Sequence, residues 1–105
     1  MIILDTDVVA VAMGTSAHDA ATAWLSLQNP HQLYLTAITR AAAFDIAAAD
    51  CYGDIVADRD RAGIPIGSAD AQIAAIARVH DALVATRDSN GFAGTGVATV
   101  NPFGG

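Results

Sequence analysis

The sequence lacks both lysine and glutamate. Its 105 residues include 11 acidic residues, all aspartates, and 5 basic residues, all arginines, which gives a formal net charge of −6. The absence of lysine excludes mechanisms that depend on a lysine nucleophile or a lysine phosphate clamp. The lack of a basic stripe excludes nucleic-acid binding built on many phosphate contacts. A chain of this charge needs a divalent cation or a few well-placed arginines to approach a polyanion.

Cysteine and long apolar runs are also scarce. Cys51 is the only cysteine, so an intrachain disulfide is excluded and a reducing cytoplasm is the expected location. No apolar run approaches the ~18 residues of a membrane span, so no membrane association is expected. The opening run from Met1 to Leu4 has no basic flank, unlike a signal peptide. Hydrophobic residues make up 53% of the chain, enough for the core of one domain over residues 1–105.

Short aliphatic runs alternate with longer segments of helical periodicity. The aliphatic runs predict strands over residues 2–4, 33–36, 83–86 and 97–100. The other segments predict helices over residues 6–13, 17–27, 38–62 and 69–80. Ser16 and Ser68 are the expected N-caps of the second and the last helix. This alternation predicts the α/β class, with a small parallel sheet of about four strands flanked by helices as an α/β/α sandwich.

Three aspartates fall where the carboxyl ends of parallel strands would meet. Asp5 follows the first strand, Asp88 follows the third by two residues, and Asp70 lies in the first turn of the helix before the third strand. Unpaired carboxylates repel one another unless a cation lies among them. Mg²⁺ or Mn²⁺ is the ion that such oxygen ligands favour. The alternatives are a helix-capping role for Asp70 and a polar turn at Asp5.

Three other residues flank these aspartates. Thr6 and Thr86 are expected either to hydrogen-bond metal-bound water or to shape their turns. Arg87 is expected either to contact a phosphate with two parallel hydrogen bonds or to pair with a neighbouring aspartate. Arg40 and Arg87 are the cations expected nearest to the carboxylates.

Six segments carry a likeness to a known family. They are MIILDTDVV from residue 1, LYLTAIT from 33, SADAQIAA from 68, VATRD from 84, GF at 91–92 and VNPF from 100. In these segments the sequence resembles the PIN-domain nucleases, especially the bacterial toxins of the VapC/FitB type. The matches run in order over nearly the whole chain.

The resemblance implies a Mg²⁺-dependent endoribonuclease that hydrolyses phosphodiester bonds in structured RNA such as tRNA, with Mn²⁺ as the other candidate ion. Asp5, Asp70 and Asp88 match three of the family's four acidic positions, which implies that they are catalytic residues and metal ligands. The resemblance also implies a type II toxin–antitoxin system, with a cognate antitoxin as partner and a homodimer as the usual unit.

This sequence departs from the family pattern in three places. Asp7 stands where the family usually has asparagine, and Ala42 stands where it has its fourth acidic residue, a glutamate. The chain is also short for the family, with the helical arm missing between about residues 42 and 44. These departures predict reduced activity. They support a second hypothesis, in which an impaired PIN-like remnant acts as an antitoxin-binding or structural module.

A further alternative involves the segment Asp5-Thr6-Asp7-Val8. It fits the aspartyl-nucleophile motif of phosphohydrolases of the haloacid-dehalogenase type. That mechanism needs a distal basic residue, usually lysine, to hold the phosphate. The absence of lysine and the short chain disfavour it.

Overall fold

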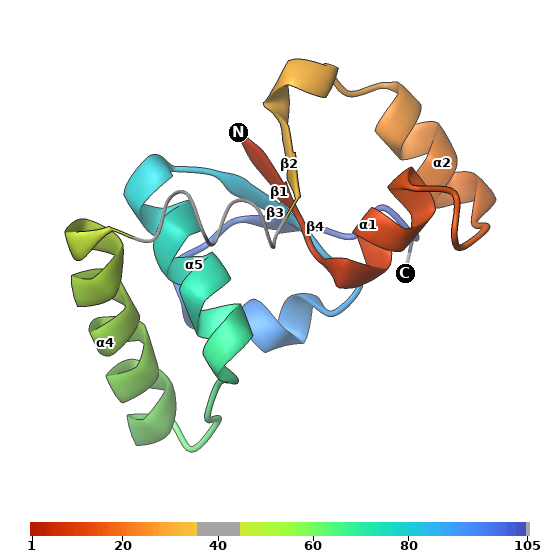
Figure 1. Ribbon diagram of the computed structural model, residues 1–105. Helices are drawn as coiled ribbons and strands as arrows, with labels where there is room; N and C mark the ends of the chain where they lie inside the picture. Colours follow the sequence, from red (N-terminus) through yellow and green to blue (C-terminus); the bar gives the residue numbers. More distant parts are fainter. Residues whose placement is uncertain (36–44, 105) are drawn as a thin grey trace.

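A four-stranded parallel sheet forms the centre of the molecule (Figure 1). The computed structural model describes residues 1–35 and 45–104. The strands are β1 (Ile2–Leu4), β2 (Leu33–Leu35), β3 (Leu83–Ala85) and β4 (Thr99–Val100), in the order β2-β1-β3-β4. All three strand pairs are parallel, with Leu4 opposite both Leu35 and Ala85. The predicted α/β class and parallel sheet are therefore confirmed.

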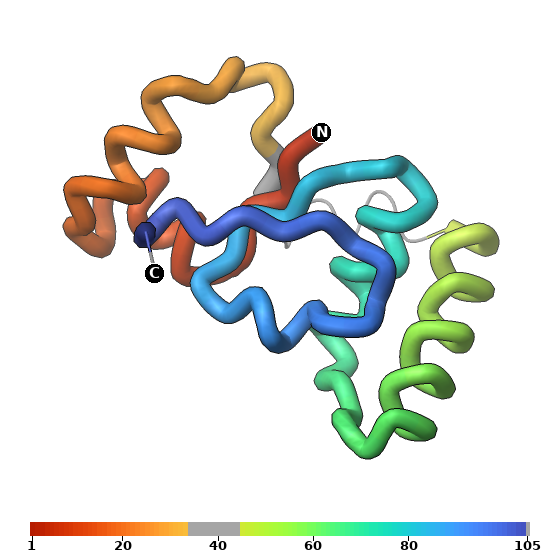
Figure 2. Tube along the Cα trace, turned by 180° about the vertical axis from the view of Figure 1, so that it is seen from behind, coloured from red at the N-terminus to blue at the C-terminus, as the bar shows by residue number. Residues whose placement is uncertain are grey.

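Helices cover both faces of this sheet. The α-helices are α1 (Thr6–Ala12), α2 (Asp19–Ser26), α4 (Ile46–Arg61) and α5 (Ser68–His80), and the 3₁₀ helices are η1 (Pro30–Gln32) and η2 (Ser89–Phe92). Figures 1 and 2 show α4 and α5 side by side on one side of the sheet and α1 and α2 on the other. Within residues 1–35 and 45–104, no helix combines the length and the apolarity needed to cross a bilayer.

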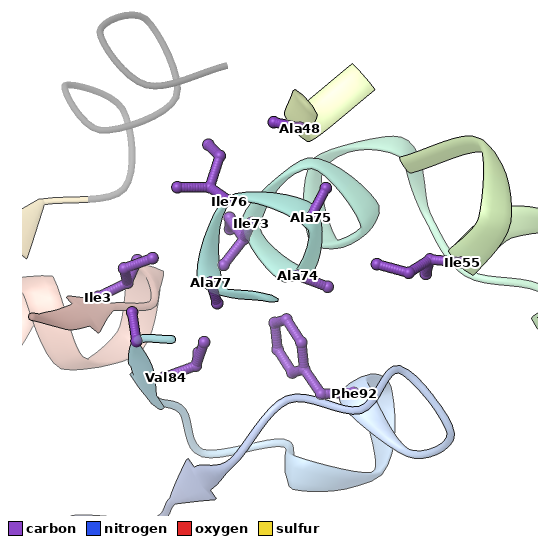
Figure 3. Packing of buried hydrophobic residues seen from close by; sticks show 11 residues of the cluster. Ile3, Ala48, Ile55, Ile73, Ala74, Ala75, Ile76, Ala77, Val84 and Phe92 are labelled. Carbon is purple, nitrogen blue, oxygen red and sulfur yellow. The ribbon is translucent and has the colours of Figure 1, made fainter. Parts of the chain in front are cut away.

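The two faces of the sheet belong to two separate apolar clusters, because successive side chains of a strand point in opposite directions. Ile3 packs in the cluster with α4 and α5, whereas Leu4 packs with Val8 of α1. Helix α5 lies between the sheet and α4, so five consecutive residues, Ile73 to Ala77, are buried. Figure 3 shows Ile55 of α4 and Phe92 of η2 pointing toward this helix from two sides. Residue Phe92 thus anchors the segment after Asp88.

The prediction of one helix over residues 38–62 is wrong at Asp45. The backbone of Asp45 is extended (φ −96°, ψ −169°), and its Oδ1 accepts a hydrogen bond from the Ala48 amide at 3.0 Å. A short carboxylate satisfies a free amide at a helix N-terminus, so the Asp45 side chain favours a helix that begins at Ile46. The chain from 36 to 44, including Arg40, Ala42 and the predicted shortening, lies outside the described residues.

Two predicted N-caps are also wrong. Helix α2 is capped by His18 rather than Ser16, because the His18 Nδ1 accepts a hydrogen bond from the Ala21 amide at 3.2 Å. Helix α5 begins at Ser68 itself, and its N-cap is Gly67, which makes no side-chain capping bond. The first turn of α5 nevertheless contains Asp70, as predicted.

Candidate functional site

The candidate site is built at the carboxyl ends of β1 and β3. These strands end side by side, since Leu4 is in register with Ala85. The Asp5 amide extends the pairing by donating to the Ala85 carbonyl at 2.9 Å. Asp5 and Thr86 are consequently neighbours, although 81 positions separate them in the sequence.

Thr86 connects two of the predicted site residues. Its side chain is fully buried, and its hydroxyl donates to Asp5 Oδ2 at 2.8 Å. The same hydroxyl oxygen accepts a hydrogen bond from the Asp88 amide at 3.1 Å. One hydroxyl thus fixes both the Asp5 carboxylate and the start of the Asp88 segment. This geometry agrees with the turn-shaping interpretation of Thr86.

Asp5 is half-buried and is held through both carboxylate oxygens. Its Oδ1 accepts a hydrogen bond from the Thr6 amide at 2.8 Å, which makes Asp5 the N-cap of α1, and its Oδ2 binds the Thr86 hydroxyl. Thr6 is exposed and shapes this turn through its amide. Asp5 therefore has the turn role predicted as its alternative. The same turn leaves its Oδ2 facing Thr86, at the end of the neighbouring strand β3.

Asp88 and Asp70 meet at Gly91. Asp88 is the N-cap of η2, where its Oδ1 accepts a hydrogen bond from the Gly91 amide at 3.3 Å. A Cβ atom placed on Gly91 would lie 3.3 Å from Asp88 Oδ2 and 3.7 Å from Asp70 Oδ2. These two carboxylate oxygens are thus at most 7.0 Å apart, the sum of the two distances. Because residue 91 is a glycine, no side chain enters the space beside these two oxygens.

The three carboxylates form one electrostatic group. Burial raises the pKa of Asp70 above its usual value, the negative charges of Asp5 and then of Asp88 raise it further, and Arg59 lowers it. Among the described residues, no three or more His, Cys, Asp or Glu side chains are arranged so that they would hold a metal ion. The predicted aspartates are therefore neighbours, but their present side-chain positions do not enclose a common point.

Arg59 is the residue of this region that was not predicted. It lies on α4 with 6% of its surface exposed. Its Nε donates to the Ile64 carbonyl at 2.5 Å, and its Nη1 donates to the carbonyls of Ala93 at 2.7 Å and Gly91 at 3.2 Å. A signal was present in the sequence, because Arg59 follows Ile55 by four residues and therefore shares its buried face of the helix.

Arg87 lies next to Asp88 in the chain and is exposed. Its guanidinium carbon is 4.4 Å from the centre of the Phe103 ring, and the His18 ring meets Phe103 edge-on at 4.7 Å. In the described part of the chain the ion pair is that of Arg61 with Asp58, and Arg87 has none. The stack on Phe103 therefore takes the place of the ion pair considered for Arg87.

Comparison with known proteins decides the family. No protein-family model matches the chain. The chain is 31% identical, over 137 aligned positions, to the VapC ribonuclease Y4jK of Sinorhizobium fredii, and the match covers 98% of each protein. The chain belongs to the PIN-domain toxins of the VapC/FitB type.

Other members of this toxin family give the same result. The toxin FitB of Neisseria gonorrhoeae is 28% identical over 98% of this chain and 99% of its own. The crystal structure of FitAcB from Neisseria gonorrhoeae superposes with a TM-score of 0.85, at 27% identity, over 99% of both chains. A structure of FitAB bound to an IR36 DNA fragment has the same TM-score over 98% of this chain and 96% of that one. The fold that carries the candidate site is therefore the fold of this toxin family.

Proposed function

We propose that this chain is an endoribonuclease toxin that hydrolyses RNA phosphodiester bonds with Mg²⁺, or Mn²⁺ in its place, and that a cognate antitoxin restrains it. The relatives named as ribonuclease and as toxin support this proposal. The observation that carries it is the meeting of Asp70 and Asp88 at Gly91, with Asp5 linked to the same segment through Thr86.

The donor set suits a hard divalent ion. Asp5, Asp70 and Asp88 offer only oxygen atoms, and Mg²⁺ is commonly held by one or two carboxylates together with water. Burial and then the charges of Asp5 and Asp88 raise the pKa of Asp70, and the repulsion among the three carboxylates is one that a bound cation would offset. When bound, such an ion supplies an activated water and stabilises charge on the phosphate.

The protein's own groups would orient the reactants around this site. Thr86 and the Thr6 amide hold the Asp5 carboxylate, and Gly91 holds that of Asp88. Arg87 would bind an RNA phosphate beside Asp88, since an exposed guanidinium can form two parallel hydrogen bonds to phosphate oxygens. Its stack on Phe103 restricts the side chain before RNA arrives. This local cation offsets part of the repulsion between RNA and an acidic chain.

The second candidate function is that of an impaired remnant that binds the antitoxin without cutting RNA. Ala42 at the usual glutamate position favours this candidate, and no glutamate exists elsewhere in the chain to replace the lost acid. The alignment with Y4jK has 137 positions against 105 residues in this chain, so at least 32 positions of that alignment have no residue here. This difference supports the proposal that a segment such as the helical arm is missing.

A cleavage assay separates these two functions. Purified protein is incubated with tRNA and Mg²⁺, with and without EDTA, beside Asp5→Asn and the control Asp50→Asn, which changes an exposed aspartate of α4. The ribonuclease proposal expects cleavage by the wild type and by Asp50→Asn, and its loss with EDTA or Asp5→Asn. Cleavage that survives both treatments contradicts the metal role.

An added variant, Ala42→Glu, tests the remnant. If cleavage appears only with this glutamate, the lost acid was limiting and the natural chain is impaired. If the wild type cuts RNA as fast as Ala42→Glu, the remnant hypothesis fails. Co-purification with the product of the neighbouring gene, followed by mass measurement of the complex, tests the antitoxin partner and the predicted homodimer.

A further inference from the structure

Arg59 is a buried cation surrounded by carbonyl oxygens. Among the described residues, it donates three hydrogen bonds, and all go to backbone carbonyls, those of Ile64, Gly91 and Ala93. Burial of a charge is costly unless hydrogen bonds compensate it, and an apolar side chain would fill the same space without that cost. The planar guanidinium instead provides donors in fixed directions. Two of these bonds hold one segment, residues 91 to 93, against α4.

That segment also directs the Asp88 carboxylate. Gly91 accepts the Arg59 hydrogen bond at its carbonyl and donates to Asp88 Oδ1 through its amide. It also lies beside both Asp88 Oδ2 and Asp70 Oδ2, because a Cβ atom there would be within 4 Å of each. A shift of Gly91 would therefore change both the direction of the Asp88 carboxylate and the space between the two acids.

We propose that Arg59 is a positioning residue of the carboxylate site, acting through Gly91 on Asp88. This inference rests on the proposed function, in which Asp70 and Asp88 hold a divalent ion. Loss of a residue that orients metal ligands in this manner typically lowers metal affinity or activity by roughly 10–100-fold. Arg59 itself touches neither substrate nor metal.

Two variants test this proposal, one for the contact between Arg59 and Gly91 and one for the contact between Gly91 and Asp88. Arg59→Lys keeps the positive charge but lacks the fork that reaches two carbonyls. Gly91→Ala adds a Cβ that would lie 3.3 Å from Asp88 Oδ2. Gly53→Ala is the matched control, because it lies on α4, the helix of Arg59, and a Cβ there meets nothing within 4 Å.

Two readouts are measured for each protein. Calorimetric titration with Mn²⁺ should show binding weakened about 10–100-fold in Arg59→Lys and Gly91→Ala, and unchanged in Gly53→Ala. NMR of the metal-free proteins should show a moved Gly91 amide signal in Arg59→Lys. It should also show a moved Arg59 guanidinium signal in Gly91→Ala, because the guanidinium donates a hydrogen bond to the carbonyl of residue 91.

The outcomes separate this inference from the proposed function. A wild type that does not bind Mn²⁺ contradicts the proposed function, while the NMR signals still decide whether Arg59 positions Gly91. Wild-type signals and wild-type Mn²⁺ affinity in Arg59→Lys overturn the inference. If Arg59→Lys does not fold, Gly91→Ala decides alone, and an unmoved Arg59 signal with unchanged affinity overturns it as well.

Discussion

The Thr86 hydroxyl donates to Asp5 Oδ2 at 2.8 Å across 81 positions of sequence, from a side chain that is fully buried. The same hydroxyl oxygen accepts a hydrogen bond from the Asp88 amide. A single buried atom thus links the end of β1 to the segment after β3. The relative positions of Asp5 and Asp88 consequently depend on a threonine that is fully buried within the protein.

Replacement of Thr86 should destabilise the fold. Thr86→Val keeps the shape but removes both hydrogen bonds, and since Asp5 is half-buried and Asp88 is exposed, the cost should be about 0.5–1.5 kcal/mol for each bond. Urea denaturation measured with EDTA present gives this difference. Thr86→Ser retains the hydroxyl and should keep more of the stability. Equal stability of the valine variant and the wild type would contradict the role assigned to this hydroxyl.

The Asp70 carboxylate should make stability fall as the pH rises. Its pKa in the folded protein is raised by burial and by Asp5 and Asp88, so the folded state holds a proton more tightly than the unfolded state. The free energy of unfolding therefore decreases as the pH rises from the ordinary value of 3.8 through the raised pKa, and the loss is complete above it.

Asp70→Asn removes this dependence. The free energy of unfolding of Asp70→Asn, minus that of the wild type, should therefore increase as the pH rises from 3.8 through the raised pKa of Asp70. Above that pKa the difference should stay constant. Urea denaturation from about pH 3.5 to about pH 7, in EDTA, measures the difference, and Asp50→Asn controls for the loss of one negative charge. A difference that falls with rising pH would be the opposite of the expected sign.

Mg²⁺ should stabilise the folded protein against heat. A ligand that binds only the folded state adds about 2.7 kcal/mol at a concentration about 100 times its Kd, and each kcal/mol raises Tm by roughly 4–8 °C in a domain of this size. Differential scanning calorimetry with and without Mg²⁺ should therefore show a higher Tm for the wild type and a much smaller shift for Asp88→Asn. An equal shift in both proteins would place the ion away from Asp88.

The strands and the placement of Asp5 and Asp88 at the carboxyl ends of β1 and β3 were predictable because both depend on short patterns. Aliphatic runs mark the strands, and parallel pairing brings the residues after β1 and β3 to one edge, where Asp5 and Asp88 lie. The metal and catalytic roles of these residues stay predictions. Asp45, Ser16 and Ser68 were assigned wrongly because a cap depends on which nearby side chain reaches a free amide, and several were available.

Arg59 was missed for a different reason. Two of its partners, Gly91 and Ala93, lie on the segment after Asp88, more than thirty positions away, and all its partners are backbone carbonyls, which carry no sequence signature. The packing of α5 against both α4 and η2 brings them together. The buried face shared with Ile55 indicates burial but not the partner. The Arg87–Phe103 stack was missed likewise, since the chain end returns beside β3 only in the folded molecule.

Arg87 should contribute one phosphate contact to RNA binding. Arg87→Ala should weaken binding and reduce the slope of log K against log salt concentration by about 1, because one fewer phosphate is neutralised. Phe103→Leu should weaken binding less and leave that slope unchanged. The Arg87 charge remains in this variant, and only the stacking that restricts the Arg87 side chain is lost. Filter binding of tRNA from about 50 to about 200 mM salt, with EDTA to prevent cleavage, measures both.

As a control, Arg61→Ala removes the exposed arginine that pairs with Asp58. An unchanged slope in Arg87→Ala, or an equal loss in Arg61→Ala, would contradict a specific contact between Arg87 and phosphate.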